Sequence, residues 1–443
     1  MADEQTLSDR DVRGEGPRLV AAMALVTLSV VLGGASRENP LRLTLVEVAS
    51  LPLLALSLGA LARNRPGRAL VFPLAVLGLT LAVPLLQLIP LPPTLWTRLP
   101  GHAAETLAFR LAGLAPPWAT SSLAPRQTLI SALALAPPIA MILGVLSLGP
   151  RERRILIYLW LALAAAGLVL GAAQLAGGAT SPFYLYETTN TGSLVGFFAN
   201  RNHEAAFLLA LLPLAAGLIA DGQGKQSLTT WLLGLFCLLA IVGLGVVGSR
   251  AGVILAAPAL LACLVIVWKT GRRGAVLAGA AGLALAGVLA FNVSPIAERF
   301  DAAAPPEFRL EAWPYVAKGA AAYLPLGAGV GAFDRVFRSV EPLTLVGPTY
   351  FNHAHNDYLE LWLEAGLVGA ALMAAFAIWL AQATWAAWRG GGGASPGLAR
   401  GAGVAIALIL LHSAVDYPLR TTSVATLFAF CCGVLASRQA PKA

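Results

Sequence analysis

A dense polar cluster runs directly into a long apolar segment in the stretch Tyr350-Phe-Asn-His-Ala-His-Asn-Asp-Tyr-Leu-Glu-Leu-Trp-Leu-Glu-Ala-Gly-Leu-Val-Gly369. His353 and His355 are two residues apart, so an extended backbone would place both on one side. Asn356 and Asp357 are good helix starters, and an N-cap there leaves His355 just before the first turn. A neutral imidazole can accept a proton, and the positive end of a helix keeps its pKa from rising. The stretch therefore predicts proton chemistry at a membrane surface.

The composition of the chain excludes a soluble fold. Of 443 residues, 58% are hydrophobic and 12% are charged, and the mean hydropathy is +0.75. Too little polar surface would remain to face water, so we expect an all-α polytopic membrane protein. The net charge of +8 comes from residues scattered through short loops, which favours topology and anionic lipid over nucleic acid. All four cysteines lie in apolar runs, so neither a disulfide framework nor a zinc site in the loops is predicted.

Apolar segments long enough to cross a bilayer recur about twelve times. We expect these spans at residues 19–35, 41–62, 69–90, 128–149, 155–176, 204–220, 228–247, 251–268, 275–292, 358–387, 400–416 and 421–437. The first could also be a signal-like segment. Lys and Arg collect in alternate loops, which by the positive-inside rule makes those loops and the tails 1–18 and 438–443 cytoplasmic. The remaining chain divides into an N-terminal membrane region, 19–190, and a second region, 191–437, whose loop 292–357 faces outward.

Two further polar motifs belong to the outward side. Asn200 and Asn202 flank Arg201 at the start of a span, and Arg250 interrupts a long apolar region in Gly-Ser-Arg-Ala-Gly. An arginine at membrane depth costs several kcal/mol unless it is paired or lines a wet cavity. Two guanidiniums near a bilayer surface form a clamp for phosphate, and Arg309 could add a third charge from the large loop, where residues 307–323 suggest a helix. The alternative to phosphate binding is that Arg201 and Arg250 extend their charged ends to the membrane surface and that Arg309 forms a surface ion pair.

His355 has three possible roles: a structural or capping residue, a metal ligand, or a general base. The outward loops contain no Asp-x-Asp and no cysteine partner, so we predict no metal. A general base fits best, and Glu360 and Glu364 on the following helix could orient it. His412 and Asp416 are four residues apart, which suggests an ion pair on one helix face lining the same cavity.

The chain resembles the O-antigen ligase and O-antigen polymerase family of bacterial envelope glycosyltransferases. The resemblance covers most of residues 190–420, and the His-x-His-Asn-x-Tyr-Leu pattern after a large loop is its most specific part. It implies a periplasmic active site in the inner membrane and no cofactor or metal. The implied donor is a glycan on undecaprenyl diphosphate, and the implied acceptor is lipid A core or another glycan. By this resemblance His355 is the catalytic base, and Arg201 and Arg250 hold the diphosphate. The further candidate substrate-binding residues are Asn200, Asn202, Arg309, His353 and Asn356.

The function we expect is inverting glycan transfer to an acceptor hydroxyl by a ligase, with an O-antigen or exopolysaccharide polymerase as the alternative. The shared motifs do not separate the two, because ligase and polymerase differ only in the acceptor. A transporter of lipid-linked glycan is an alternative of another class. It should show related halves with broken spans in corresponding places. We find no such repeat, and the polar residues gather on one face.

Overall fold

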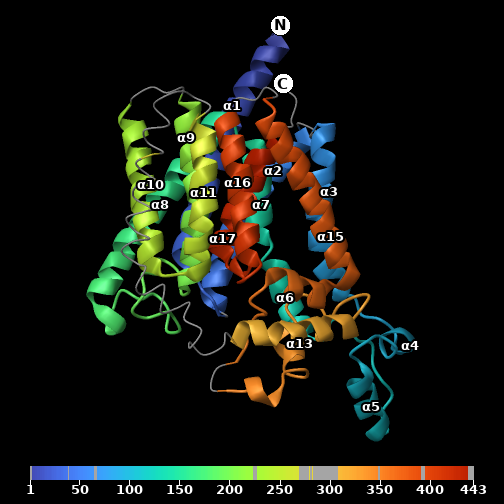
Figure 1. Ribbon diagram of the computed structural model, residues 1–443. Helices are drawn as coiled ribbons and strands as arrows, with labels where there is room; N and C mark the ends of the chain where they lie inside the picture. Colours follow the sequence, from blue (N-terminus) through green and yellow to red (C-terminus); the bar gives the residue numbers. More distant parts are fainter. Residues whose placement is uncertain are drawn as a thin grey trace.

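The computed structural model describes residues 2–37, 39–63, 67–222, 227–268, 279, 282, 308–347, 350–390 and 395–437. These residues form helices and loops with no β-strand, and the single isolated β-bridge joins Leu91 and Ala119. The all-α prediction is confirmed. The helices stand side by side in one bundle (Figure 1).

The described residues include ten helical segments that are long and apolar enough to span a membrane. They comprise α1 (Ala2–Leu32), α2 (Pro40–Arg63), α3 (Val71–Gln87), the pair α6 (Pro125–Leu133) and α7 (Ala136–Ser147), α8 (Pro150–Ala176), α9 (Arg201–Asp221), α10 (Leu228–Val247), α11 (Arg250–Trp268), α15 (Asp357–Trp388) and α16 (Pro396–Ser413). The apolar helix α17 (Thr422–Ser437) is shorter. The polytopic membrane fold is confirmed. The span expected at 275–292 lies outside the described residues, apart from 279 and 282.

Helix α9 lies at the centre of the bundle. Every residue of its most apolar stretch is buried inside the protein. In α3 only 11% of the corresponding residues are buried, and the exposed apolar side chains suit a helix that faces lipid. Glycine permits close contact between α9 and α16: a Cβ on Gly217 would lie 2.6 Å from the Gly397 carbonyl oxygen. Asp221, at the end of α9, accepts hydrogen bonds from the backbone N–H groups of Gly397 and Leu398 at 2.7 and 3.1 Å. These contacts fix the position of α9 and hence of the residues at its start.

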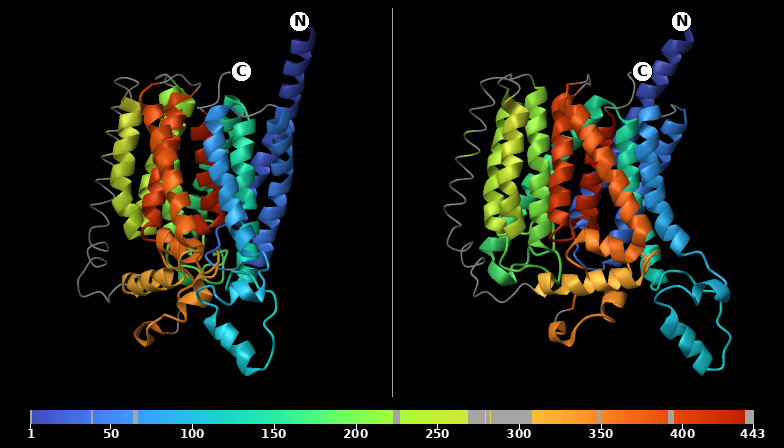
Figure 2. Two further views of the ribbon diagram at one scale, coloured as in Figure 1. Left: turned by 90° about the vertical axis from the view of Figure 1, so that its right-hand side faces the viewer. Right: turned by 45° about the vertical axis from the view of Figure 1, so that its right-hand side comes forward.

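A separate layer covers one end of the bundle. Helix α13 (Phe308–Ala322) runs across that end, with α14 (Phe333–Phe337) beyond it (Figure 2). The short helices α4 (Pro93–Trp96) and α5 (Ala103–Leu111) lie on the same side, whereas α1 begins and α17 ends at the opposite side. A small apolar core that includes Val316, Phe333 and Leu363 joins α13, α14 and α15. The helix expected within 307–323 is therefore present, and it packs over the bundle.

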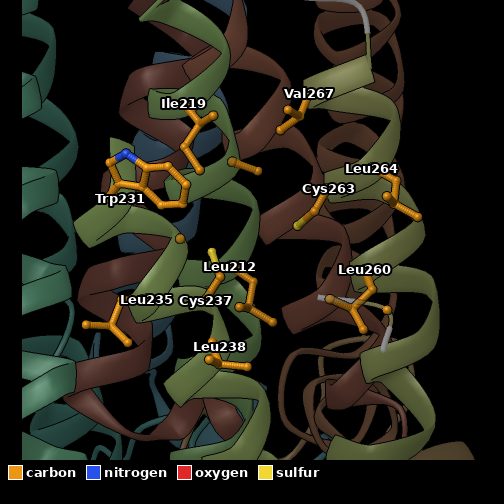
Figure 3. A pocket seen from close by; sticks show the side chains of 13 residues that line it. Leu212, Ile219, Trp231, Leu235, Cys237, Leu238, Leu260, Cys263, Leu264 and Val267 are labelled. Carbon is orange, nitrogen blue, oxygen red and sulfur yellow. The ribbon is translucent and has the colours of Figure 1, made fainter. Parts of the chain in front are cut away.

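An apolar cavity of about 330 Å³ opens among α9, α10 and α11 (Figure 3). Leu212, Trp231 and Cys263 are among its lining residues, and none of the lining side chains is charged. Trp231 is close to the start of α10 and Val267 is close to the end of α11, so the cavity lies toward the end of the bundle opposite α13. It is separate from the polar residues described next.

Candidate functional site

The two arginine motifs begin adjacent helices at the α13 end of the bundle. Arg201 is the first residue of α9 and Arg250 the first of α11. A Cβ on Gly252 would lie 2.8 Å from the Cβ of Ala205, so the first turns of the two helices are in close contact. Gly248, with φ 66°, provides the left-handed turn that connects α10 to α11. Both arginines thus lie at helix N-termini, where the positive end of the helix dipole favours an anion.

Asn200 and Asn202 have identifiable local roles. Asn200 is the N-cap of α9, and its Oδ1 accepts the backbone N–H of Asn202 at 2.9 Å. The side-chain amide of Asn202 donates to Oδ2 of Asp416, more than two hundred residues away in the chain. The start of α9 is thereby tied to the loop that follows α16.

His355 and Asp416 form a buried hydrogen-bonded pair. His355 Nδ1 lies 3.0 Å from Asp416 Oδ1, and the two side chains are 12% and 1% exposed. Arg309 Nη1 on α13 lies 3.8 Å from the other carboxylate oxygen. His355 has φ 50°, a left-handed conformation that costs a non-glycine residue roughly 1–2 kcal/mol. Such strained conformations persist only where surrounding contacts hold the backbone in place, and they are common at functional sites.

The charges around this pair favour a neutral imidazole beside an ionised carboxylate. Burial lowers the pKa of His355 from its ordinary value, the hydrogen bond and charge of Asp416 oppose that shift, and Arg309 adds to it. Burial alone would raise the pKa of Asp416, but the hydrogen bond from His355 and the nearby positive groups hold it well below its usual range. His355 can therefore accept a proton at neutral pH, and Asp416 can stabilise the imidazolium that results.

A second histidine–carboxylate pair lies beside the first. His353 Nδ1 is 2.7 Å from Glu360 Oε1, and Arg420 Nη1 is 3.1 Å from the same oxygen. Arg420 also lies 2.9 Å from Glu364 and 3.6 Å from Asp357. Burial would lower the pKa of Arg420, but the three carboxylates outweigh burial and raise it, so the guanidinium stays charged. Arg420 thus balances carboxylates that an apolar helix could not otherwise bury.

Residues 235–374 match the family model described as O-antigen ligase. Over these residues the chain is similar to the O-antigen ligase family. The matched region contains Arg250, Arg309, His353, His355 and Asn356. A search of curated proteins found no match to this chain. The family indicates a membrane enzyme of the ligase or polymerase type, whose substrates are a lipid-linked glycan and an acceptor.

Residues outside the O-antigen ligase match complete the site. Tyr417 lies against three imidazoles, with ring centroids 4.9, 4.3 and 4.8 Å from those of His203, His353 and His355. Burial raises the pKa of Tyr417, so its hydroxyl stays protonated. Asn200, Arg201 and Asn202 from α9 also lie outside the match. The structure therefore extends the site of the O-antigen ligase region to α9 and to the loop after α16.

Asn356 begins α15, as its sequence context predicts. Its Oδ1 accepts the backbone N–H groups of Tyr358 and Leu359 at 3.0 and 3.1 Å, and its Nδ2 donates to the Ala414 carbonyl at 3.0 Å. The side chain thus has a structural role as N-cap. Because Asn356 directly follows His355, its contacts also help to hold the backbone at His355 in place.

The expected ion pair between His412 and Asp416 is wrong. Helix α16 ends at Ser413, so the spacing of four residues does not place both on one helix face. Asp416 bonds to His355 instead, and neither ring nitrogen of His412 has a hydrogen-bond partner.

Arg420 was not singled out from the sequence. The available signal was the set Asp357, Glu360 and Glu364, which fall on one face of an apolar helix and require a buried cation.

Across the described residues, no group of three or more His, Cys, Asp and Glu side chains has a geometry that could hold a metal ion. The histidines around Tyr417 are instead paired individually with Asp416, Glu360 and Thr421.

Proposed function

We propose that this protein transfers a glycan from undecaprenyl diphosphate to an acceptor hydroxyl at the periplasmic face of the bacterial inner membrane. The observation that carries the proposal is the His355–Asp416 pair, which lies at the end of the bundle where α9 and α11 begin with arginines. The O-antigen ligase match supports the reaction class. The positively charged loops at the other end support the orientation.

His355 acts as the general base. Its Nδ1 is engaged by Asp416, which leaves Nε2 to remove the proton from the acceptor hydroxyl. The acceptor oxygen forms a bond to the anomeric carbon as the bond from that carbon to the phosphate oxygen breaks. The proton remains on His355, and Asp416 stabilises the imidazolium. A single displacement inverts the anomeric configuration.

Arg201 and Arg250 stabilise the leaving group. Negative charge builds on the diphosphate as the glycosidic bond breaks, and the two guanidiniums, at helix N-termini whose dipoles also favour an anion, stabilise that charge. The paired donors of arginine match phosphate oxygens, so the clamp supplies positive charge without a metal ion or a cofactor. Arg309, His353, Asn200 and Asn202 surround the reacting groups as further substrate-binding candidates.

The proposed acceptor is lipid A core, which makes the enzyme a ligase, and the alternative is a polymerase that extends another lipid-linked glycan. The product that accumulates in a deletion strain decides between them. Lipid-linked polymer that fails to reach the cell surface is the expected result for a ligase. Single repeat units on core, or complete loss of polymer, would identify a polymerase. A strain with unchanged surface and secreted glycans would reject both.

A further inference from the structure

Helix α13 contacts the histidine–carboxylate pair at two points. Arg309 Nη1 lies 3.8 Å from Asp416, and the indole N–H of Trp313 donates to the Ala354 carbonyl at 3.0 Å. Arg309 and Trp313 are four residues apart, so they lie one above the other on the same face of the helix. One face of α13 therefore touches both the carboxylate that binds His355 and the backbone that precedes it.

The backbone of Ala354, the residue before His355, is held by a hydrogen bond at its N–H and another at its carbonyl. Its N–H donates to Glu360 Oε2 at 2.7 Å, and its carbonyl accepts from Trp313. Ala354 is 2% exposed, so these side chains take the place of water. The Ala354 carbonyl belongs to the peptide bond with His355. Its orientation therefore defines φ of His355, which has the left-handed value of 50°.

We infer that Trp313 is a positioning residue of the reaction, which holds His355 in its left-handed conformation and so keeps Nδ1 on Asp416. The inference rests on the proposed role of His355 as the base. Tryptophan suits this position because its partly buried apolar ring carries an N–H that reaches a backbone acceptor. Phenylalanine would keep the ring and lose the donor.

The test compares Trp313→Phe with Tyr315→Phe, a control two residues away whose half-exposed side chain lies outside the site. The chain has five histidines, so the His355 signal in nitrogen-15 histidine spectra of the membrane-embedded protein can be assigned with a His355→Gln sample. We expect Trp313→Phe to move the His355 Nδ1 resonance toward that of an imidazole without the Asp416 bond. The glycan transfer rate should fall about three- to tenfold, with the KM for donor unchanged. Tyr315→Phe should change neither quantity.

Trp313→His, which keeps a ring N–H donor, provides a second variant and should recover part of the lost rate. An unchanged His355 resonance in Trp313→Phe would overturn the inference, as would equal losses in Trp313→His and Trp313→Phe. The spectroscopic readout does not depend on turnover. A shifted resonance in a protein whose wild type transfers no glycan would therefore reject the proposed function while leaving the positioning role intact.

Discussion

The two histidine–carboxylate pairs are alike in contact geometry and different in surroundings. Their nitrogen–oxygen distances are 2.7 Å for His353–Glu360 and 3.0 Å for His355–Asp416, and both rings lie against Tyr417. Glu360 is also bound by the Arg420 guanidinium and the Ala354 N–H. Asp416 instead receives the Asn202 amide and lies near Arg309, whose side chain is 37% exposed.

We propose that this difference separates the reactive pair, His355–Asp416, from a pair that mainly stabilises the site, His353–Glu360. His353 and Glu360 are seven residues apart, and a buried charge cluster fixes both. His355 and Asp416 are 61 residues apart, and their pairing depends on α13, α15 and the loop after α16 holding their positions. We propose that a similar hydrogen bond builds the site in one case and activates an imidazole in the other.

The largest effect on activity should come from replacing His355. His355→Ala should lower the glycan transfer rate by roughly 10² to 10⁴, the usual contribution of a general base, while donor binding persists. His353→Ala should cost less because its partner Glu360 stays paired with Arg420. Transfer rates and donor binding measured on purified enzyme check both variants. Equal losses, or a larger loss for His353→Ala, would reverse the assignment of the two pairs.

Removing Arg420 should damage the fold instead of the chemistry. Arg420→Met leaves buried carboxylates on α15 without their cation, a loss that typically costs about 3–5 kcal/mol. The control is Arg338→Met. Its pair with Asp334 at 2.9 Å is 60% and 43% exposed, so its loss should cost at most about 1 kcal/mol. Thermal unfolding and yield of the inserted protein measure both. Similar stabilities would show that Arg420 has no structural role of this kind.

The charge of Arg420 is balanced by carboxylates, so the proposed diphosphate clamp relies on Arg201 and Arg250. Arg250→Lys should weaken donor binding by about tenfold or more, since an ammonium cannot make the paired contact of a guanidinium. Arg335→Lys, on the exposed part of α14, is the matched control and should have no effect. Donor titration against each variant gives the comparison. Wild-type donor affinity in both Arg250→Lys and Arg201→Lys would remove the clamp from the mechanism.

The smallest effects should be opposite shifts in the pH dependence of transfer. A base works only when neutral, so activity falls as the pH drops through the pKa of His355. Arg309 lowers that pKa, so Arg309→Gln should raise it and move the acid limb to higher pH. Asp416 raises it, so Asp416→Asn should move the limb to lower pH at a reduced maximal rate. Rate profiles from pH 4 to 8 would record both shifts, and shifts in the same direction would contradict the assignment.

Local patterns predicted those parts of the site that depend on near neighbours. The N-cap at Asn356 and the arginine that begins α11 follow from a few consecutive residues. The partner of Asp416 could not be found in that way. A spacing of four residues suggested His412, but the helix ends first, and the competing partner comes from a loop 61 residues earlier.

The sequence by itself determined that this is an all-α membrane protein with polar residues gathered at one end, because hydropathy and loop charge act locally along the chain. It also determined the family resemblance and the identity of the candidate base. Only the tertiary structure decided which carboxylate serves which histidine and that Arg420 balances the carboxylates on α15. It also decided that α13 reaches both Asp416 and the backbone before His355. Those contacts join segments far apart in the chain, and they form only when buried charges find partners during helix packing.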